Sequence, residues 1–436
     1  MKRPLLPIEA LAVADEGEHA PERRALFSGG NRIELLCGGA ELFPAMCAAI
    51  EAAEREVWLA SYIFNDDAAA LAVLDALCAA AARGVRLHIV VDGFGSFETL
   101  GALQARFAAA GAELAVFRPL RGWWSWVQPG QLRRLHLKLC LVDGSIGFVG
   151  GVNLIDDRFD QRHGWSQVPR LDFAVRAQGP VLGGVADALR AVWTRASMGR
   201  DWPVELIALA RAAQPVQQAR RLLHDLRIGD TPPLLALQAP ALEALAPQRA
   251  AFVVRDNLRR RRTIERSYVD AIRRARERVD LVCPYFYPGH VFRHALRDAA
   301  DRGVRVRLLM QGVWDYRAAA LAARAVYGEL LAHGVRIYEY TPAFLHAKVA
   351  VVDADWATVG SSNIDPLSLL LNLEANVVVR DAAFNAALAR QIDAAVAVSR
   401  EVTPAETDGR VNLLRRGFVA WCARLFLRIA GATGRY

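Results

Sequence analysis

The sequence predicts an α/β protein built from two similar halves that share one site. The chain has 436 residues, roughly three times the commonest domain size. A short HxKxxxxD constellation occurs twice, at 136–143 and at 346–353. The segments around the two copies repeat the same order of helix-like and β-like stretches. We therefore expect two α/β halves related by a pseudo-twofold axis, with mixed sheets flanked by helices.

The repeat extends well beyond the motif. Residues 54–96 resemble residues 276–316: in each, a helix-like stretch feeds a β-rich run, then an Ala/Leu/Arg helix, then ArgGlyVal and another β-rich run. This alternation predicts a mainly parallel or mixed sheet that is covered on both faces. We predict four regions: a first half (1–186), a helical connector (187–249), a second half (250–400) and a basic amphipathic tail (401–436).

Composition narrows the class of protein. The net charge of +8 and the pI of about 9.4 favour a polyanionic partner, either nucleic acid or an anionic membrane surface. The six cysteines are widely spaced without a CxxC pair, which argues against a zinc site and a disulfide framework. No segment approaches the roughly 20 uninterrupted apolar residues of a spanning helix, and the first residues are acidic where a signal peptide would be apolar. We expect a protein that is not exported and uses no metal or other cofactor.

The repeated motif lies on predicted β-strands. Around the first copy the chain alternates as LeuHisLeuLysLeuCysLeuValAsp, so His136 and Lys138 point the same way. His346 and Lys348 do likewise in the second copy. Only three of the 54 cationic Lys and Arg residues are lysine, and two of the three lie in the motif. Because ammonium and guanidinium groups are not interchangeable, these positions require lysine.

These residue types suit a phosphoryl transfer. The reaction needs a nucleophile, a proton donor for the leaving oxygen and positive charge around the phosphoryl oxygens. Two histidines, two lysines and the downstream Asn153 and Asn363 supply all three without a metal. One copy alone is incomplete, so we expect both copies to meet in one pocket. One imidazole would attack phosphorus and the other would protonate the leaving group, in an order that the residues do not fix.

A histidine nucleophile needs its second ring nitrogen held, usually by a carboxylate. Asp172 and Glu374 precede β-rich runs at matching places and are our candidates for this role. Asp143 and Asp353 complete the predicted catalytic set, because they end the two motifs. They also end their strands, and Asp143 precedes a glycine, so turn formation stays open as their role.

Two aromatic segments predict contact with a membrane. The loop before the first motif contains Trp123, Trp124 and Trp126, and the tail interleaves arginines with Phe418 and Trp421. Indole rings prefer the boundary between water and lipid headgroups, and basic amphipathic helices lie in that boundary. The alternatives are a buried aromatic cluster for the loop and a helix packed on the protein's own body for the tail.

The two motifs, followed by GlyGlyValAsn and GlySerSerAsn, resemble the phospholipase D superfamily over nearly the whole chain. Within it, GlySerSerAsnIleAspPro, ProTyrPheTyrProGly and PheValValArgAspAsn are similar to bacterial cardiolipin synthases of the B type. The resemblance implies transfer of a phosphatidyl group from one phosphatidylglycerol, or a similar phospholipid, to another, with release of glycerol. It further implies a covalent phosphatidyl-histidine intermediate, with His136 as the nucleophile and His346 as the acid.

The resemblance also implies a place in the cell. We expect a peripheral protein on the cytoplasmic face of the bacterial inner membrane, with an anionic phospholipid as its partner. Nucleic acid and an obligate protein partner are not expected. The chain shows no counterpart of the amino-terminal transmembrane pair of the A type, so attachment is expected from loops and the tail.

The halves are not equivalent, and other functions share this fold. Gly151 stands where the second copy has Ser361, and Asp172 where it has Glu374. Phospholipid hydrolysis and a nuclease of the same superfamily remain alternatives. A nuclease predicts a basic groove, whereas a lipid enzyme predicts an apolar channel rimmed by aromatics. A nonenzymatic membrane scaffold is disfavoured because both motifs are intact.

Overall fold

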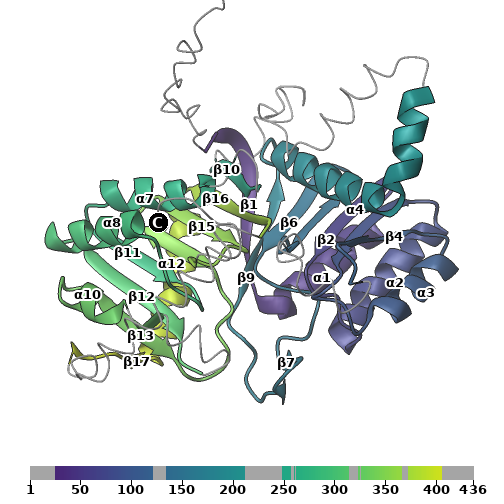
Figure 1. Ribbon diagram of the computed structural model, residues 1–436. Coiled ribbons are helices and arrows are strands. Elements are labelled where there is room, and N and C mark those ends of the chain that lie inside the picture. The colour runs from purple at the N-terminus through teal and green to yellow at the C-terminus, as the bar shows by residue number, and fades with distance from the viewer. Residues whose placement is uncertain are drawn as a thin grey trace, which may run out of the picture.

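The computed structural model shows two α/β halves side by side (Figure 1). It describes residues 25–120, 134–211, 248–256, 260, 262–313, 323–324, 326–365 and 372–404. The first half contains β1 (Ser28–Cys37), α1 (Gly38–Glu51), β2 (Glu56–Ser61), α2 (Ala68–Ala82), β3 (Arg86–Asp92), α3 (Leu100–Ala109), β4 (Leu114–Phe117), β5 (Leu139–Val142), β6 (Ile146–Gly150), β7 (Phe159–Asp160), β8 (Gly164–Trp165), β9 (Phe173–Gln178) and α4 (Leu182–Arg211).

The second half repeats this order, except that its described residues include no counterpart of β7 and β8 and end in an additional short strand, β17. It contains β10 (Gln248–Arg255), α7 (Thr263–Arg274), β11 (Arg278–Val282), α8 (His290–Asp301), β12 (Arg305–Gln311), α10 (Tyr327–Leu331), β13 (Arg336–Tyr340), β14 (Val349–Val352), β15 (Trp356–Gly360), β16 (Glu374–Arg380), α12 (Ala382–Ala397) and β17 (Arg400–Glu401).

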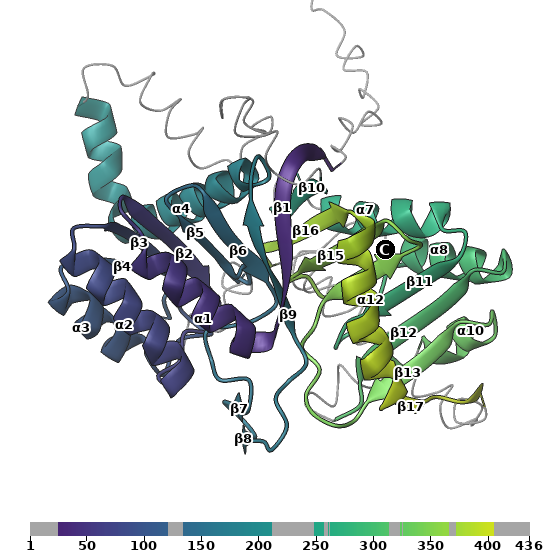
Figure 2. The same ribbon diagram turned by 180° about the vertical axis from the view of Figure 1, so that it is seen from behind.

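The described strands of both halves join in one 15-stranded sheet whose order is mirrored about its centre. From the centre outward, the first half runs β1, β9, β6, β5, β2, β3, β4 and the second runs β10, β16, β15, β14, β11, β12, β13, followed by the short edge strand β17, which has no partner in the mirrored order. β1 and β10 meet antiparallel at the centre (Figure 2). In each half three strands are parallel and the others antiparallel. The predicted pseudo-twofold relation and mixed sheet are therefore confirmed.

The repeated ArgGlyVal segments end equivalent helices. Gly84 follows α2 and Gly303 follows α8, with φ angles of +91° and +87°. Val85 N–H bonds back to the carbonyl of Ala80, closing the helix end in the left-handed geometry that glycine adopts without strain. The chain then enters the next parallel strand. The sequence repeat thus marks two helix-to-strand turns.

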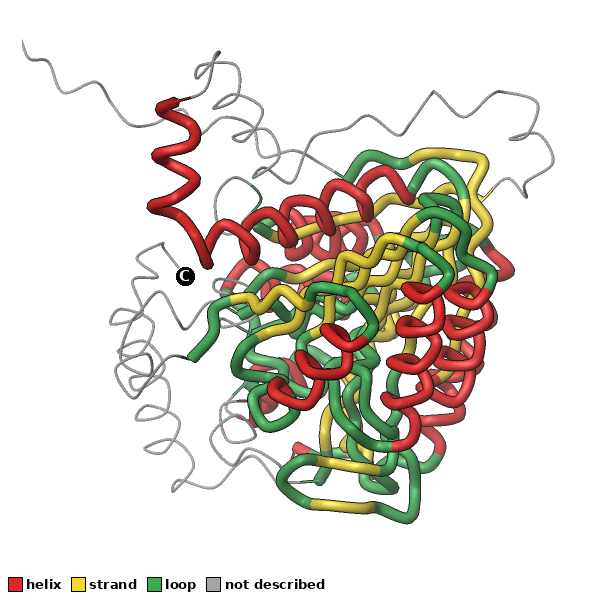
Figure 3. The backbone as a smooth tube through the Cα atoms, turned by 90° about the vertical axis from the view of Figure 1, so that its right-hand side faces the viewer, coloured by secondary structure: helices red, strands yellow, loops and turns green. Residues whose placement is uncertain are grey.

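Helices cover the sheet on both faces (Figure 3). In the first half α1, α2 and α3 bury one core, which includes Leu74 and Phe107. In the second half α7, α8 and α10 bury another, which includes Phe292. A third core is shared by both halves and lies under α4 and α12, with Val185 and Leu388 fully buried in it. This shared core holds the halves in a fixed relation.

The predicted connector and tail are only partly described. α4 begins before the connector, at Leu182, and its first turns bury Val185, Leu189 and Val192 in the shared core. The remainder of the connector, 212–247, and the tail from 405 lie outside the described residues. Among the helices that the structure describes, none combines the length and apolar character needed to cross a membrane.

Candidate active site

Backbone contacts between the halves position both motifs. His136 and Lys138 lie just before β5, and His346 and Lys348 lie at the same place before β14. His136 N–H donates to the carbonyl of Leu373 at 3.1 Å, in the second half. His346 N–H donates to the carbonyl of Leu171 at 2.9 Å, in the first half. Each motif is therefore anchored on the segment that leads into the other half's carboxylate.

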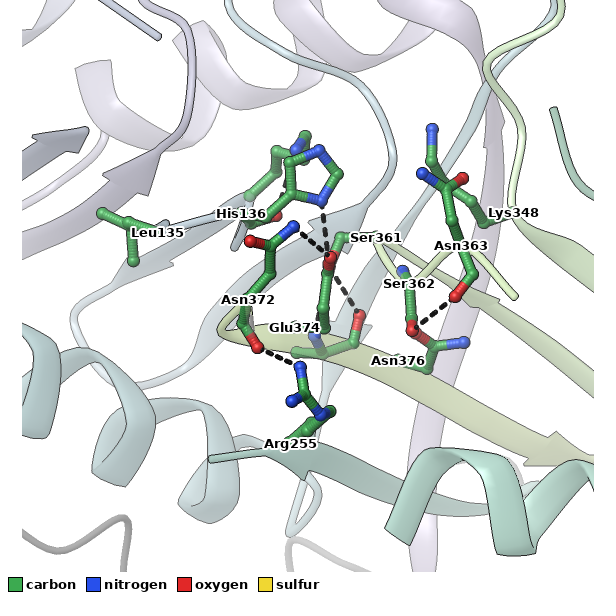
Figure 4. A network of polar contacts seen from close by, with 12 residues as sticks. Leu135, His136, Arg255, Lys348, Ser361, Ser362, Asn363, Asn372, Glu374 and Asn376 are labelled. Atoms are coloured by element: carbon green, nitrogen blue, oxygen red, sulfur yellow. Dashed lines mark hydrogen bonds and ion pairs between the residues drawn. The ribbon is translucent and has the colours of Figure 1, made fainter. Parts of the chain in front are cut away.

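The histidine–carboxylate pairs also cross between the halves. His136 Nδ1 lies 2.8 Å from Glu374 Oε2, and His346 Nδ1 lies 2.6 Å from Asp172 Oδ2. Both carboxylates are buried, and Figure 4 shows Glu374 beneath His136. The pairing leaves Nε2 of each ring for a substrate. Because each half completes the other's histidine, the two copies form one composite site.

The two motif lysines are buried beside the histidines. Lys138 Nζ donates to the carbonyl of His136 at 3.0 Å and lies 5.3 Å from the centre of the Tyr62 ring. Lys348 Nζ donates to the carbonyl of His346. Burial lowers the pKa of Lys138 to about 7 and that of Lys348 to about 8. Their charges are thus held in a poorly solvated place, where they act strongly on a phosphate.

Burial and the positive charges of Lys138 and Lys348 lower the pKa values of both histidines. Burial lowers the pKa of His136, although the carboxylate of Glu374 opposes this shift. Burial, followed by the positive charges of Lys348 and Lys138, lowers the pKa of His346 well below its usual value. Burial also raises the pKa of Asp172 to about 6. Before substrate binds, both imidazoles are therefore neutral near pH 7, the form that a nucleophile requires.

The two carboxylates have different surroundings. Ser361 Oγ donates to Glu374 Oε2 at 2.6 Å, and Asn372 Nδ2 lies 3.5 Å from Glu374 Oε1 (Figure 4). A Cβ atom at Gly151 would lie 2.3 Å from Asp172 Oδ1, so glycine leaves the space that this carboxylate occupies. The substitution of Gly151 for the serine of the other copy thus has a steric cause.

The two asparagines after the motifs are buried in the same region. Asn153 is 3% exposed and Asn363 is 8% exposed. Asn153 Oδ1 has no hydrogen-bond partner within the described residues. A buried amide oxygen without a partner is uncommon in a folded protein and is available to a ligand group that donates a hydrogen bond, such as a hydroxyl. We keep both asparagines as predicted contacts of the substrate phosphate, to which their side-chain N–H groups would donate.

Asp143 and Asp353 are not placed with the histidines. They follow the far ends of β5 and β14, with φ angles of +51° and +49°. The Asp143 carboxylate accepts the backbone N–H groups of residues 54–56 at 2.9 Å each. The Asp353 carboxylate accepts those of residues 276–278 at 2.9–3.2 Å. The structure gives both aspartates the turn role that the sequence left open, because their oxygens are engaged there.

Two further residues position the motifs and were missed by sequence reasoning. Asp92 Oδ2 accepts the N–H of Leu135 at 2.9 Å, and Gln311 Oε1 accepts the N–H of Leu345 at 2.6 Å. Each fixes the residue before a motif histidine. Both residues end the strand that follows ArgGlyVal, and this matching place in the repeat is the sequence signal that could have identified them.

The predicted membrane residues lie outside the described residues: Trp123, Trp124, Trp126, Phe418 and Trp421. The described loop from Asn153 to Asp172 offers another aromatic. It leaves the site, forms the projecting β7–β8 hairpin and returns to the site (Figure 1). Trp165 at the end of β8 is 66% exposed. An exposed indole therefore stands on an extension of the active-site loop.

Sequence comparison places this duplicated arrangement in a known family. A family model described as cardiolipin synthase, PLD-like domain, matches residues 46–164 and 268–396, one match in each half. The chain belongs to this family. Cardiolipin synthase B of Salmonella typhimurium is 35% identical over 359 residues, covering 82% of this chain and 79% of that protein. Cardiolipin synthase B of Escherichia coli K12 is 35% identical over 370 residues, covering 84% and 81%.

A solved structure carries the same fold. Phosphatidylserine synthase of Haemophilus influenzae superposes with a TM-score of 0.59 over 90% of this chain and 93% of its own, at 12% identity. At that identity the likeness shows the fold alone. Together with the sequence relatives, the duplicated site indicates a phosphatidyltransferase of the cardiolipin synthase family.

Proposed function

We propose that the chain makes cardiolipin by transferring a phosphatidyl group from one phosphatidylglycerol to another, with release of glycerol. The crossed pairs, His136 with Glu374 and His346 with Asp172, carry this proposal. The two pairs present the imidazole Nε2 atoms to one substrate, and the buried Lys138 and Lys348 lie beside them. The relatives named cardiolipin synthase B support cardiolipin as the product.

The proposed chemistry has two steps. In the first, Nε2 of His136 attacks phosphorus, a P–N bond forms, and the P–O bond to the departing glycerol breaks. The glycerol oxygen takes a proton from His346. In the second, His346 removes the proton of the acceptor hydroxyl, whose oxygen attacks phosphorus while the P–N bond breaks. Lys138 and Lys348 stabilise the charge on the phosphoryl oxygens in both steps.

The acid role of His346 depends on the substrate. Before substrate binds, its pKa is lowered by burial and by the two lysines. A bound phosphodiester brings a negative charge next to those lysines and opposes their effect on the imidazole. Substrate binding is therefore expected to raise the pKa of His346. Its proton is then available when the leaving group needs it.

We further propose that the protein works at a membrane surface, peripherally on the cytoplasmic face of the inner membrane. A lipid substrate must reach His136 from a bilayer. The exposed Trp165 on the loop between Asn153 and Asp172 supports this proposal, because indole rings partition to the headgroup region. The basic net charge of +8 favours an anionic lipid surface.

Product analysis tests this function. Purified protein is incubated with phosphatidylglycerol vesicles, and lipids and glycerol are quantified. We expect cardiolipin and glycerol in equal amounts. Phosphatidic acid in place of cardiolipin would show a hydrolase instead, and no change in the lipid would contradict a lipid substrate. A labelled oligonucleotide in a parallel sample should stay intact; its cleavage would indicate the nuclease alternative.

A further inference from the structure

An arginine-lined pocket lies at the end of the second half's sheet that is remote from the histidines. Helix α7 and the strands β10, β15 and β16 enclose about 230 Å³ there. β16 begins at Glu374 in the active site and ends at Arg380 in the pocket, a length of about 20 Å at the usual rise per residue. Four arginines line the pocket: Arg249, Arg266, Arg274 and Arg380.

Two of these arginines oppose each other across neighbouring strands. Arg249 of β10 and Trp356 of β15 are both directly opposite Arg380 of β16. Residues directly opposite in an antiparallel pair share a face of the sheet, with Cβ atoms about 5 Å apart, and like charges there are destabilising. Arg380 Nη1 lies 3.7 Å from Asp355 Oδ2, but that carboxylate is 61% exposed. Solvent therefore weakens the compensation.

The pocket also contains buried polar atoms that lack partners. Thr263 is 7% exposed, and its Oγ1 is buried. Within the described part of the chain neither this hydroxyl nor Nε of Arg380 has a hydrogen-bond partner. Both residues line the pocket. Unmade hydrogen bonds of buried groups are costly, so a ligand that accepts from both would stabilise the fold.

The charge of the pocket specifies the ligand. Four arginines and one acid, Asp270, give a net charge of +3 (4 − 1) among the lining residues. Guanidinium groups match phosphate oxygens in bidentate pairs, and a hydroxyl donates to a further oxygen. We propose that this pocket binds a phosphate group, supplied either by free phosphate or by a phospholipid headgroup. It is separate from the site of transfer, at the opposite end of the same strands.

Binding is measured on the full chain carrying His136→Ala, so that no lipid turnover is needed. Inorganic phosphate is titrated by calorimetry, and sedimentation with phosphatidylglycerol vesicles is compared with sedimentation with phosphatidylcholine vesicles. Arg249→Gln and Arg274→Gln are placed in this background. Arg273→Gln is the matched control, because it removes the same charge from an exposed neighbour on α7 that does not line the pocket.

We expect the two pocket variants to weaken binding by about tenfold or more, because each removes charge-assisted hydrogen bonds. Arg273→Gln should bind as its parent does. Without phosphate at low salt, Arg249→Gln should raise the melting temperature, since it relieves the opposed charges. Any phosphate that binds at the histidine site contributes equally to the binding measured for every variant.

The two measurements, calorimetry and vesicle sedimentation, distinguish the source of the phosphate. A difference in the calorimetry identifies free phosphate, and a difference only in sedimentation with phosphatidylglycerol vesicles identifies a headgroup. Equal binding by all variants, or an equal loss with Arg273→Gln, would overturn the proposal. Neither result depends on whether the chain makes cardiolipin.

Discussion

At the scale of single residues, the buried carboxylates Glu374 and Asp172 fix the orientation of the two reactive rings. Glu374→Gln and Asp172→Asn keep the size of each side chain but remove the negative charge that stabilises an imidazolium. We expect each to lower kcat by about 10²–10⁴-fold while the protein stays folded. Cardiolipin formation and the melting temperature measure the two effects. Near-normal turnover in either variant would show that its histidine does not rely on the crossed pair.

Asp143 and Asp353 should behave differently, because their carboxylates hold backbone N–H groups at turns. Asp143→Asn is expected to lower stability by about 1 kcal/mol and to leave turnover of the folded protein nearly unchanged. Asp353→Asn is the matched variant in the other half. Denaturant unfolding and product assays on the same samples separate the effects. A turnover loss as large as that of Glu374→Gln, at unchanged stability, would restore a catalytic role.

The pKa values predict a bell-shaped pH dependence of kcat/KM. Above about pH 7 Lys138 loses the charge that stabilises phosphoryl oxygens, and below about pH 6 Asp172 gains a proton and holds His346 less firmly. Both changes lower the rate. Lys138→Arg should lower turnover, because a guanidinium does not replace the ammonium group, but it stays charged throughout, so the alkaline limb of the remaining activity should move toward about 8, the pKa of Lys348. An unmoved alkaline limb would assign that limb to another group.

The reactive residues themselves were predictable from the sequence, because a doubled HxK on alternating strands marks both pairs. Asp172 and Glu374 followed from their matching places in the repeat. The crossing of the pairs was not predictable, since it depends on how the halves pack. Asp92 and Gln311 occupy matching places in the repeat, but their different side chains hide the match, and their contacts with backbone N–H groups depend on the packing of the loop before each motif.

At the scale of elements, the β7–β8 hairpin extends the active-site loop and exposes Trp165. Trp165→Ala should weaken sedimentation with phosphatidylglycerol vesicles severalfold, because a large interfacial ring is lost. Val398→Ala is a suitable control, since Val398 is 58% exposed, follows α12 in the other half and does not line the arginine-lined pocket. Turnover of a soluble short-chain substrate should be unaffected. Equal vesicle binding by both variants would contradict membrane contact by the hairpin.

The helices and strands followed the sequence closely where local signals were strong. ArgGlyVal at two places marked the ends of α2 and α8, because Gly84 and Gly303 take left-handed backbone angles. The start of the connector was a weaker signal. A helix rich in Ala, Leu and Arg has the same sequence pattern whether it bridges two halves or packs on one of them. The burial of Val185 and Leu189 in α4 depends on tertiary packing, which the pattern does not show.

At the scale of the whole molecule, the mirrored sheet explains why the motif occurs twice. Each half supplies a histidine, a lysine and an asparagine, and each lends its carboxylate to the other half's histidine. The sequence repeat predicted two halves about an axis. It did not predict that β1 and β10 would join them into one continuous sheet, because edge-to-edge pairing of the central strands has no signature in either copy.

The most direct test of this composite site is cardiolipin formation from phosphatidylglycerol vesicles by the wild-type chain and by His136→Ala and His346→Ala. One shared site requires both imidazoles, so we expect each single variant to lose turnover by at least about 10³-fold while its melting temperature stays close to that of the wild type. Two independent sites would instead leave about half of the activity in each variant, and that result would contradict the account.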